Sequence, residues 1–172
     1  MLGLERGKVI LSEYDVNWPL EFENEKKSIQ NTLTENEIRI EHIGSTSVEN
    51  LCAKPIIDIL IGIKHFDEGH KFASLLEATG YAYKGENGIP GRHFFVKGNP
   101  RTHHLHMVEM NSVFFRDHLL FRDYLRENPE KKDQYAELKR SMAVKYFDDR
   151  EKYTDSKAEF IQNILQKAKG IK

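Results

Sequence analysis

The sequence predicts an α/β fold, with a mixed sheet of about five strands, helices packed on the sheet and a C-terminal helical cap. Up to about residue 110, short apolar segments of strand type alternate with helical patterns. From about residue 111 to 170, apolar residues recur only at helical spacing. The 172 residues contain no internal repeat, low-complexity tract or linker that would divide them, so we expect one domain over residues 1–172.

Strands are predicted where short apolar segments lie between turn residues. The glycine-rich segment 84–91 is expected to be a loop that can flank a site. Gly98-Asn99-Pro100 is a turn, so the strands on either side of it should form a hairpin. The predicted strands are residues 8–11, 39–43, 56–63, 81–83, 93–96 and 103–109.

Helices are predicted where apolar residues recur every three or four positions. Asn17 is the expected N-cap of the first helix, and Pro19 suits its first turn. Gly80 is the expected C-cap of a helix over 66–79. The buried faces of the expected helices are Trp18, Phe22, Ile29 and Leu33; Phe72, Leu75 and Leu76; Phe115, Leu119, Tyr124 and Leu125, ending before Pro129; Tyr135, Leu138, Met142 and Tyr146; and, after a charged turn at 148–150, Phe160, Ile161, Ile164, Leu165 and Ala168.

The composition excludes several classes of protein. Lys and Arg number 26 and Asp and Glu 27, so the net charge is −1 and no general basic field attracts nucleic acid. The single cysteine, Cys52, excludes an intrachain disulfide and should pack as a small apolar side chain. The sequence contains no G-x-S-x-G elbow, Walker loop or dinucleotide fingerprint, which disfavours a serine hydrolase, a P-loop enzyme and a Rossmann dehydrogenase.

We expect a cytoplasmic protein without a membrane partner. The N-terminal residues lack the apolar region of a signal peptide, and no apolar run approaches the ~20 residues that span a bilayer. One cysteine is also compatible with a reducing compartment.

The strongest functional signal lies between residues 38 and 63. An apolar strand runs into a Gly44-Ser45 turn, and a second apolar strand carries one acid, Asp58. Backbone N–H groups and hydroxyls at such a turn can bind an anion, although the hydroxyls can also simply cap a short helix. A carboxylate in an isoleucine-rich strand is costly to bury without a partner. The pattern therefore predicts half of a phosphate-and-metal site, and the alternative is that Asp58 caps a turn or pairs with Lys54.

These residues resemble the nucleotidyltransferase superfamily, the fold of polymerase beta and the small antibiotic nucleotidyltransferases. More closely, the chain resembles the GrpB family from about residue 7 to about residue 168. The residues that carry this resemblance are His42–Val48 with Ala53–Ile59, supported by Tyr14-Asp15 with Trp18-Pro19 and Phe22, by His103–His106, and by Phe121–Arg126 followed by Pro129.

The resemblance implies an enzyme that transfers a nucleotidyl group from a nucleoside triphosphate to a small acceptor. Active members of the superfamily hold two Mg²⁺ ions with acids at positions like 58 and 60 and a third acid from a neighbouring strand. This chain has Leu60 at the second position. The departure favours two alternatives, a metal-dependent hydrolase or transferase and a non-catalytic module that binds nucleotide or phosphate.

The resemblance also assigns roles to residues. Gly44 and Ser45, with Thr46 and Ser47, would hold phosphate. Asp58 would bind metal, and Lys54 and Arg92 would neutralise developing charge. The residues expected to be catalytic are Asp58 and Lys54.

The sequence His103-His104-Leu105-His106 predicts a second metal-binding element. On a strand, His104 and His106 share one face and His103 looks the other way. Neutral imidazoles favour Zn²⁺ and related metals, so together with Asp58 they would supply three ligands. His42 would be a fourth ligand or a supporting partner. A divalent metal, Mg²⁺ or a transition metal such as Zn²⁺, is the expected cofactor; the alternative is that these histidines merely form hydrogen bonds.

Basic residues near these elements predict a phosphorylated ligand. A nucleotide or other phosphorylated small molecule needs cations, and arginine can bind phosphate with two donors. Each residue taken singly could instead be an exposed surface charge. The candidates are Lys54, Arg92, Lys97 and Arg101 near the strands, and Lys139, Lys145 and Lys157 on the helical cap.

Overall fold

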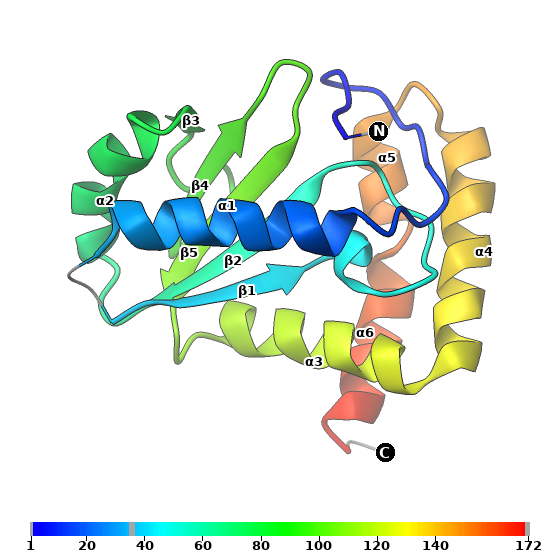
Figure 1. Ribbon diagram of the computed structural model, residues 1–172. Helices are drawn as coiled ribbons and strands as arrows, with labels where there is room; N and C mark the ends of the chain where they lie inside the picture. The colour runs from blue at the N-terminus through cyan, green and yellow to red at the C-terminus, as the bar shows by residue number, and fades with distance from the viewer. Residues whose placement is uncertain (1, 35–36, 171–172) are drawn as a thin grey trace.

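The centre of the molecule is a five-stranded mixed sheet (Figure 1). The computed structural model describes residues 2–34 and 37–170. The strand order is β1-β2-β5-β4-β3, in which β2 and β5 are parallel and the other neighbours antiparallel. The predicted sheet and its β4–β5 hairpin are confirmed. The strands are β1 Arg39–Ile43, β2 Ile57–Ile63, β3 Tyr81–Tyr83, β4 Arg92–Lys97 and β5 His103–Glu109.

The described residues also form six α-helices and one short 3₁₀ turn. The C-terminal cap is confirmed, but it contains one helix more than predicted, because α5 lies where a charged turn was expected. The Asp149 side chain accepts a hydrogen bond from the backbone N–H of Lys152, which caps α5. The helices are α1 Trp18–Thr32, η1 Ser45–Ser47, α2 Glu68–Glu77, α3 Val113–Glu127, α4 Pro129–Lys145, α5 Arg150–Asp155 and α6 Ala158–Ala168. Among the described residues, no helix combines the length and the apolar character needed to cross a membrane.

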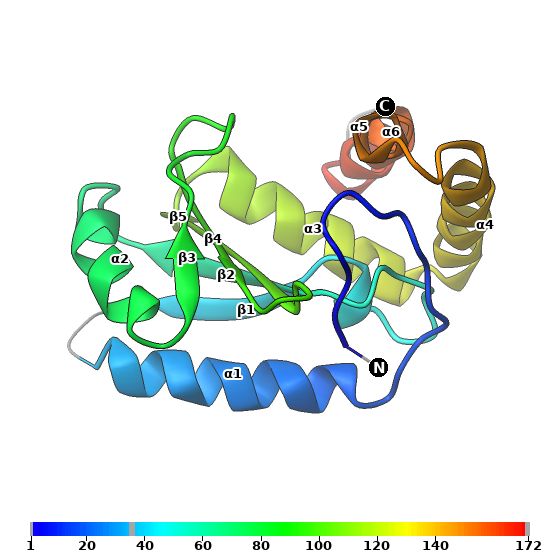
Figure 2. The same cartoon turned by 90° about the horizontal axis from the view of Figure 1, so that it is seen from above.

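The helices cover the sheet unequally (Figure 2). α1 and α2 pack on one face, where Trp18, Phe22 and Phe72 meet the odd-numbered isoleucines of β2. α3 packs on the other face, where Phe115 contacts Leu60. β2 is therefore covered on both sides, which explains why the whole strand is apolar except for Asp58. Burying each such side chain contributes about 1.5–3 kcal/mol.

A separate apolar cluster joins the helical cap to the segment between β1 and β2. Leu51 and Cys52 of that segment pack with Leu125 of α3 and Tyr135 of α4. Cys52 is fully buried in this cluster. The cluster also includes Leu138 of α4 and Phe160 of α6, so it positions these two helices beyond the end of the sheet at which β1 ends and β2 begins (Figure 1).

Three local predictions were wrong. Residues 8–11 form no strand; single bridges instead join Leu4 to Arg101 and Ser12 to Ala53. α2 is shorter than predicted, and Leu75 is exposed because it lies on the outer side of this helix. Asn17 precedes α1 but does not cap it, since its side chain donates to Asp15 at 2.8 Å.

Arg122 fastens α3 to β1. Its guanidinium donates to the Glu41 carboxylate at 2.7 Å and to the His42 carbonyl oxygen at 3.0 Å, while also pairing with Asp123. The Arg122 side chain is buried. A buried ion pair is stabilising only while both partners remain, so removing the guanidinium would leave Glu41 without its main partner.

We predict that Arg122→Gln lowers the free energy of unfolding by about 2–4 kcal/mol, because it leaves the buried His42 carbonyl oxygen unpaired and leaves Glu41 with only the exposed Arg39 as an ion-pair partner among the described residues. Arg116→Gln on the same helix is the matched control, since the Arg116 side chain is 56% exposed. The control should change the free energy by no more than about 0.5 kcal/mol. Urea unfolding of the three proteins measures both values. Equal effects of the two substitutions would contradict the anchoring role of Arg122.

Candidate functional site

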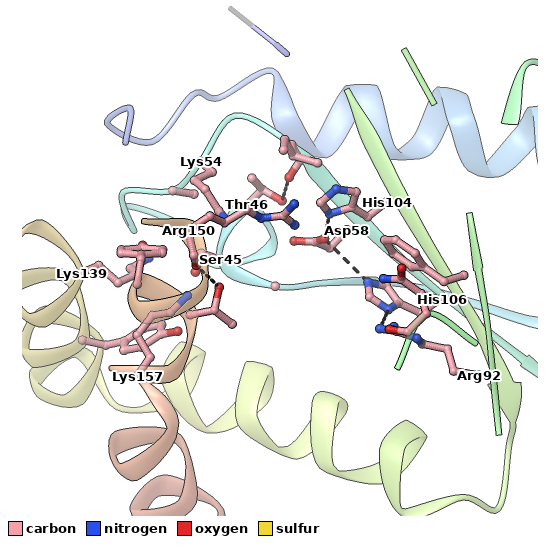
Figure 3. Close-up of a pocket in the computed structure, with 18 residues that line it drawn as sticks. Ser45, Thr46, Lys54, Asp58, Arg92, His104, His106, Lys139, Arg150 and Lys157 are labelled. Atoms are coloured by element: carbon pink, nitrogen blue, oxygen red, sulfur yellow. Dashed lines mark hydrogen bonds and ion pairs between the residues drawn. The ribbon is translucent and has the colours of Figure 1, made fainter. Parts of the chain in front are cut away.

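A cavity of about 350 Å³ lies between the end of the sheet and the helical cap. The Gly44-Ser45 turn and Lys54, next to β2, form one side of it. Figure 3 shows Asp58, Arg92, His104 and His106 facing it from the sheet and Lys139, Arg150 and Lys157 from the cap. Most of the residues that the sequence singled out therefore meet in one place.

The turn at Gly44 requires glycine. Its backbone has φ 69° and ψ −175°, a conformation that is essentially restricted to glycine. A Cβ atom at this position would lie 2.5 Å from Asp58 Oδ2. The turn is closed by Ser47 Oγ, which donates to the Gly44 carbonyl oxygen at 2.6 Å. Gly44 thus allows the backbone to approach the carboxylate closely.

Asp58 is held by the two histidines predicted to share its face. His104 lies directly beside Asp58 in the parallel β2–β5 pair, so the two side chains point the same way. His104 Nδ1 is 3.1 Å from Asp58 Oδ1, and His106 Nε2 is 3.9 Å from the same oxygen. His103 lies on the opposite face, as predicted, beside Ile57.

Hydrogen-bond partners fix the tautomers of both imidazoles. Since a carboxylate oxygen accepts, His104 carries its proton on Nδ1. Arg92 can only donate, and its Nη1 is 3.2 Å from His106 Nδ1, so the His106 proton is on Nε2 and faces Asp58. His104 Nε2 is buried and has no hydrogen-bond partner among the described residues.

These contacts set the charge of the group. Burial alone would raise the pKa of Asp58, but hydrogen bonds from His104 and His106 outweigh it and hold the pKa well below its usual range. Burial lowers the pKa of His106 to about 4, although Asp58 opposes this shift. Near neutral pH the group is therefore an ionised carboxylate beside a neutral His106 imidazole.

Arg92 connects the sheet to the loop predicted at 84–91. Its guanidinium donates to the carbonyl oxygens of Glu86 and Asn87 at 3.1 and 3.0 Å. It also lies 4.7 Å from the centroid of the Phe94 ring. Burial lowers the pKa of Arg92, which remains far above neutral because guanidinium is so basic. Arg92 thus brings a fixed positive charge to one side of the cavity.

Two of the three lysines predicted on the cap reach the cavity. Lys139 is only 2% exposed, donates to the Cys52 carbonyl oxygen and lies against Tyr135. Burial lowers the pKa of Lys139 to about 7, and burial together with Lys54 lowers the pKa of Lys157 to about 8. Lys145 does not line the cavity and instead lies 5.2 Å from the Tyr146 ring centroid. Buried amines of this kind oppose folding unless a ligand offsets their charge.

The cavity is strongly positive. Asp58 is the only carboxylate among the described residues that line it, and no lysine or arginine in its lining forms an ion pair with a carboxylate elsewhere in the described chain. The five cations in the lining are Lys54, Arg92, Lys139, Arg150 and Lys157.

The structure does not bring His42, Lys97 and Ser47 into the cavity lining. His42 pairs with Ile59 in the sheet and faces α1, where it stacks on Phe22, so its ring lies on the other face of the sheet from Asp58. Lys97 also faces α1 and forms an ion pair with Glu25 at 2.8 Å. Ser47 does not line the cavity. His42 still supports the site indirectly, since its Nε2 lies 3.0 Å from Thr46 Oγ1 in the cavity wall.

The cavity does not fit the two magnesium ions that the superfamily resemblance implies. Leu60 is buried against Phe115 and supplies no second carboxylate. Nowhere in the described ranges do three His, Cys, Asp or Glu side chains lie in an arrangement that could hold a metal ion. His104 Nδ1 faces the carboxylate itself rather than a shared point in the cavity. Metal binding by Asp58, His104 and His106 thus stays a prediction.

The sequence analysis missed Arg150, Tyr135 and Tyr153 as lining residues. Arg150 begins α5, in a stretch that was assigned to a charged turn, and Figure 3 shows its side chain reaching into the cavity. Tyr135 and Tyr153 are buried, so their apolar spacing indicated only a core position. The available signal was the position of Arg150 near Lys157 along the chain, since Arg150 begins α5 and Lys157 immediately precedes α6.

Curated relatives share nearly the whole of this chain. The family model described as GrpB protein matches residues 8–167. The UPF0157 protein YqkA of Bacillus subtilis is 42% identical over 166 residues, which are 96% of this chain and 48% of that protein. The glutamate-rich protein GrpB of Alkalihalophilus pseudofirmus is 36% identical over 171 residues, 96% of this chain and 98% of that protein. The chain thus spans about half the length of the first relative and nearly all of the second.

Solved structures confirm the fold class. The conserved protein GrpB from Enterococcus faecalis superimposes with a TM-score of 0.86 and 40% identity, over 92% of this chain and 96% of that chain. The Cid1 poly(U) polymerase bound to MgGTP superimposes with a TM-score of 0.56 over 77% of this chain and 44% of that chain. The identity to Cid1 is 12%, so this similarity shows the fold alone, which is nucleotidyltransferase-like.

We predict that Gly44→Ala lowers the free energy of unfolding by about 1–3 kcal/mol more than Gly88→Ala. Gly88 is the control because it also has a positive φ, of 83°, but a Cβ there would meet nothing within 4 Å. The difference contains the clash with Asp58 together with the strain of the Gly44 backbone conformation, and a double-mutant cycle separates the two. Adding Asp58→Ala should remove much of this difference in a double-mutant cycle, measured by chemical unfolding. A difference that persists without the carboxylate would show that Gly44 is not required by Asp58.

Proposed function

We propose that this chain, which belongs to the GrpB family, binds the phosphate groups of a nucleoside triphosphate and transfers its nucleotidyl group to a small acceptor, with pyrophosphate as the leaving group. The observation that carries the proposal is the charge of the cavity. Five cations meet beside the Gly44-Ser45 turn and face a single carboxylate. Positive charges gathered in this way repel one another, and an anion bound among them would offset that repulsion.

Each side of the cavity supplies a different part of the proposed binding. The Gly44-Ser45 turn presents a hydroxyl and backbone N–H groups to phosphate, as in other anion-binding turns. Lys54 and Arg92 lie on opposite sides of Asp58 and would neutralise charge that develops on the transferred phosphate. Lys139 and Lys157 come from the cap and would close over the ligand. Cationic side chains would then supply the charge stabilisation that acids and metal ions supply in other enzymes of this fold.

Asp58 is suited to hold a cation rather than to accept a proton. Its lowered pKa keeps it ionised, and this makes it a weak base near neutral pH. Oδ1 is engaged by His104, whereas Oδ2 accepts no hydrogen bond from the described residues. One divalent ion on this carboxylate is compatible with the proposal, and no second acid is needed for phosphate binding.

A metal-dependent hydrolase or transferase is the second candidate. The observation that favours it is the direction of His104 and His106, both of which turn a nitrogen toward the same Asp58 oxygen. A neutral imidazole is a good ligand for Zn²⁺, and burial keeps His106 neutral near neutral pH. In this case Asp58, His104 and His106 would hold the ion, which would activate water or polarise a phosphate oxygen.

A non-catalytic binding module is the third candidate, and Leu60 favours it. Leu60 is buried at the position where active enzymes of the superfamily have a second carboxylate. A protein that had lost the transfer reaction but still bound phosphate would not need that carboxylate. Binding and turnover must therefore be measured separately.

We predict that calorimetry detects binding of at least one nucleoside triphosphate, with and without Mg²⁺. Lys54→Gln should weaken the affinity by roughly tenfold, since one charge-assisted contact to phosphate is lost. Lys64→Gln is the control, because Lys64 is exposed and follows β2 at the opposite end of the sheet. Release of pyrophosphate with a panel of small acceptors tests transfer. If calorimetry detects no binding of any nucleotide, the proposal is overturned. Binding without release of pyrophosphate would support the non-catalytic module.

We predict for the second candidate that a transition metal co-purifies and is lost in His106→Ala but kept in His103→Ala. The two histidines lie on the same strand and face opposite sides of the sheet, so the pair is a matched control. Elemental analysis of the purified proteins measures the metal content. A metal lost equally in both variants, or absent from the unsubstituted protein, would eliminate this candidate.

A further inference from the structure

We propose that the anion site continues into a second subsite formed by Arg6, Arg101 and Arg150, so that the preferred ligand carries two or more linked phosphate groups. The inference rests on the proposed phosphate binding and specifies the class of ligand. It concerns residues at the edge of the cavity, outside the group around Asp58.

The fold brings three separate segments together at this edge. The N-terminal segment lies beside the β4–β5 turn, because Leu4 and Arg101 exchange both backbone hydrogen bonds at 2.9 and 3.0 Å. α5 lies next to them (Figure 1). Arg6, Arg101 and Arg150 line one small hollow there. Guanidinium groups from three distant parts of the sequence are thus placed around a common point.

The hollow adjoins the main cavity. Lys54, Ile56, His104 and Arg150 line both spaces, so the second set of cations lies next to the cavity that contains the Gly44-Ser45 turn. The hollow itself has a volume of only about 10 Å³, which is room for about one water molecule. A phosphate group would therefore sit at its mouth, in contact with both spaces. Two anionic groups so close together are most simply linked phosphates of one molecule.

The charges in the hollow are not balanced by the protein. Burial lowers the pKa of Arg101, and the nearby guanidinium groups of Arg150 and Arg6 lower it further. Glu5 lines the hollow but forms no ion pair with these arginines in the described chain. Bringing like charges together without a counter-charge opposes folding. An arginine also binds phosphate with two parallel donors, so this cluster matches a phosphate chain in both charge and shape.

Calorimetry with three probes tests the inference, namely inorganic phosphate, pyrophosphate and tripolyphosphate at constant ionic strength and pH. We expect affinity to rise by roughly tenfold or more from phosphate to tripolyphosphate as the second subsite is engaged. Arg101→Gln should remove most of this rise and leave the affinity for phosphate within about twofold. Arg6→Gln, in the exposed N-terminal segment, should act in the same way and cannot affect the core. Arg116→Gln, on exposed α3 surface, is the control and should behave as the unsubstituted protein.

The outcomes separate this inference from the function on which it rests. Equal affinity for all three probes would overturn the second subsite and leave phosphate binding intact. An equal loss for all three probes in Arg101→Gln would show only a general effect of charge, and would also overturn it. Failure to bind any of the probes would overturn the proposed phosphate binding itself.

Discussion

The geometry of the cavity depends on the ionised carboxylate of Asp58 at the start of the central strand. A buried charge of this kind requires donors, and the parallel pairing of β2 with β5 places His104 directly beside it. Arg92 then orients His106 toward the same oxygen. Gly44 has no side chain, so the turn after β1 can approach the other oxygen. Four segments of the chain are thereby arranged around one carboxylate.

The second organising feature is an excess of positive charge that the protein itself does not neutralise. Lys139 is almost wholly buried, and its lowered pKa means that its protonated form opposes folding at neutral pH. The apolar cluster of Leu51, Cys52, Leu125 and Tyr135 keeps this lysine beside the cavity despite that cost. A protein whose stability is marginal retains such charges where a ligand makes use of them.

α3 links the two features. Arg122 donates a hydrogen bond to the carbonyl oxygen of His42, and Arg126 donates one to the carbonyl oxygen of Ser47. One helix therefore binds the backbone on both sides of the turn that contains Gly44. The same helix carries Leu125 into the cluster beneath α4. The position of the turn and the position of the cap are consequently coupled, although they belong to different layers of the fold.

The sequence by itself determined the strands, most of the helices and the residues near Asp58, because apolar periodicity and turn residues are local properties. Period two also placed His104 and His106 on one face and His103 on the other. Periodicity could not say which face of a neighbouring strand meets the cavity, and the structure places His42 and Lys97 on the face toward α1. Only the tertiary structure decided which side chains reach the cavity. Strand register and the packing of α5 depend on contacts between residues far apart in the chain, and such contacts leave no local pattern in the sequence.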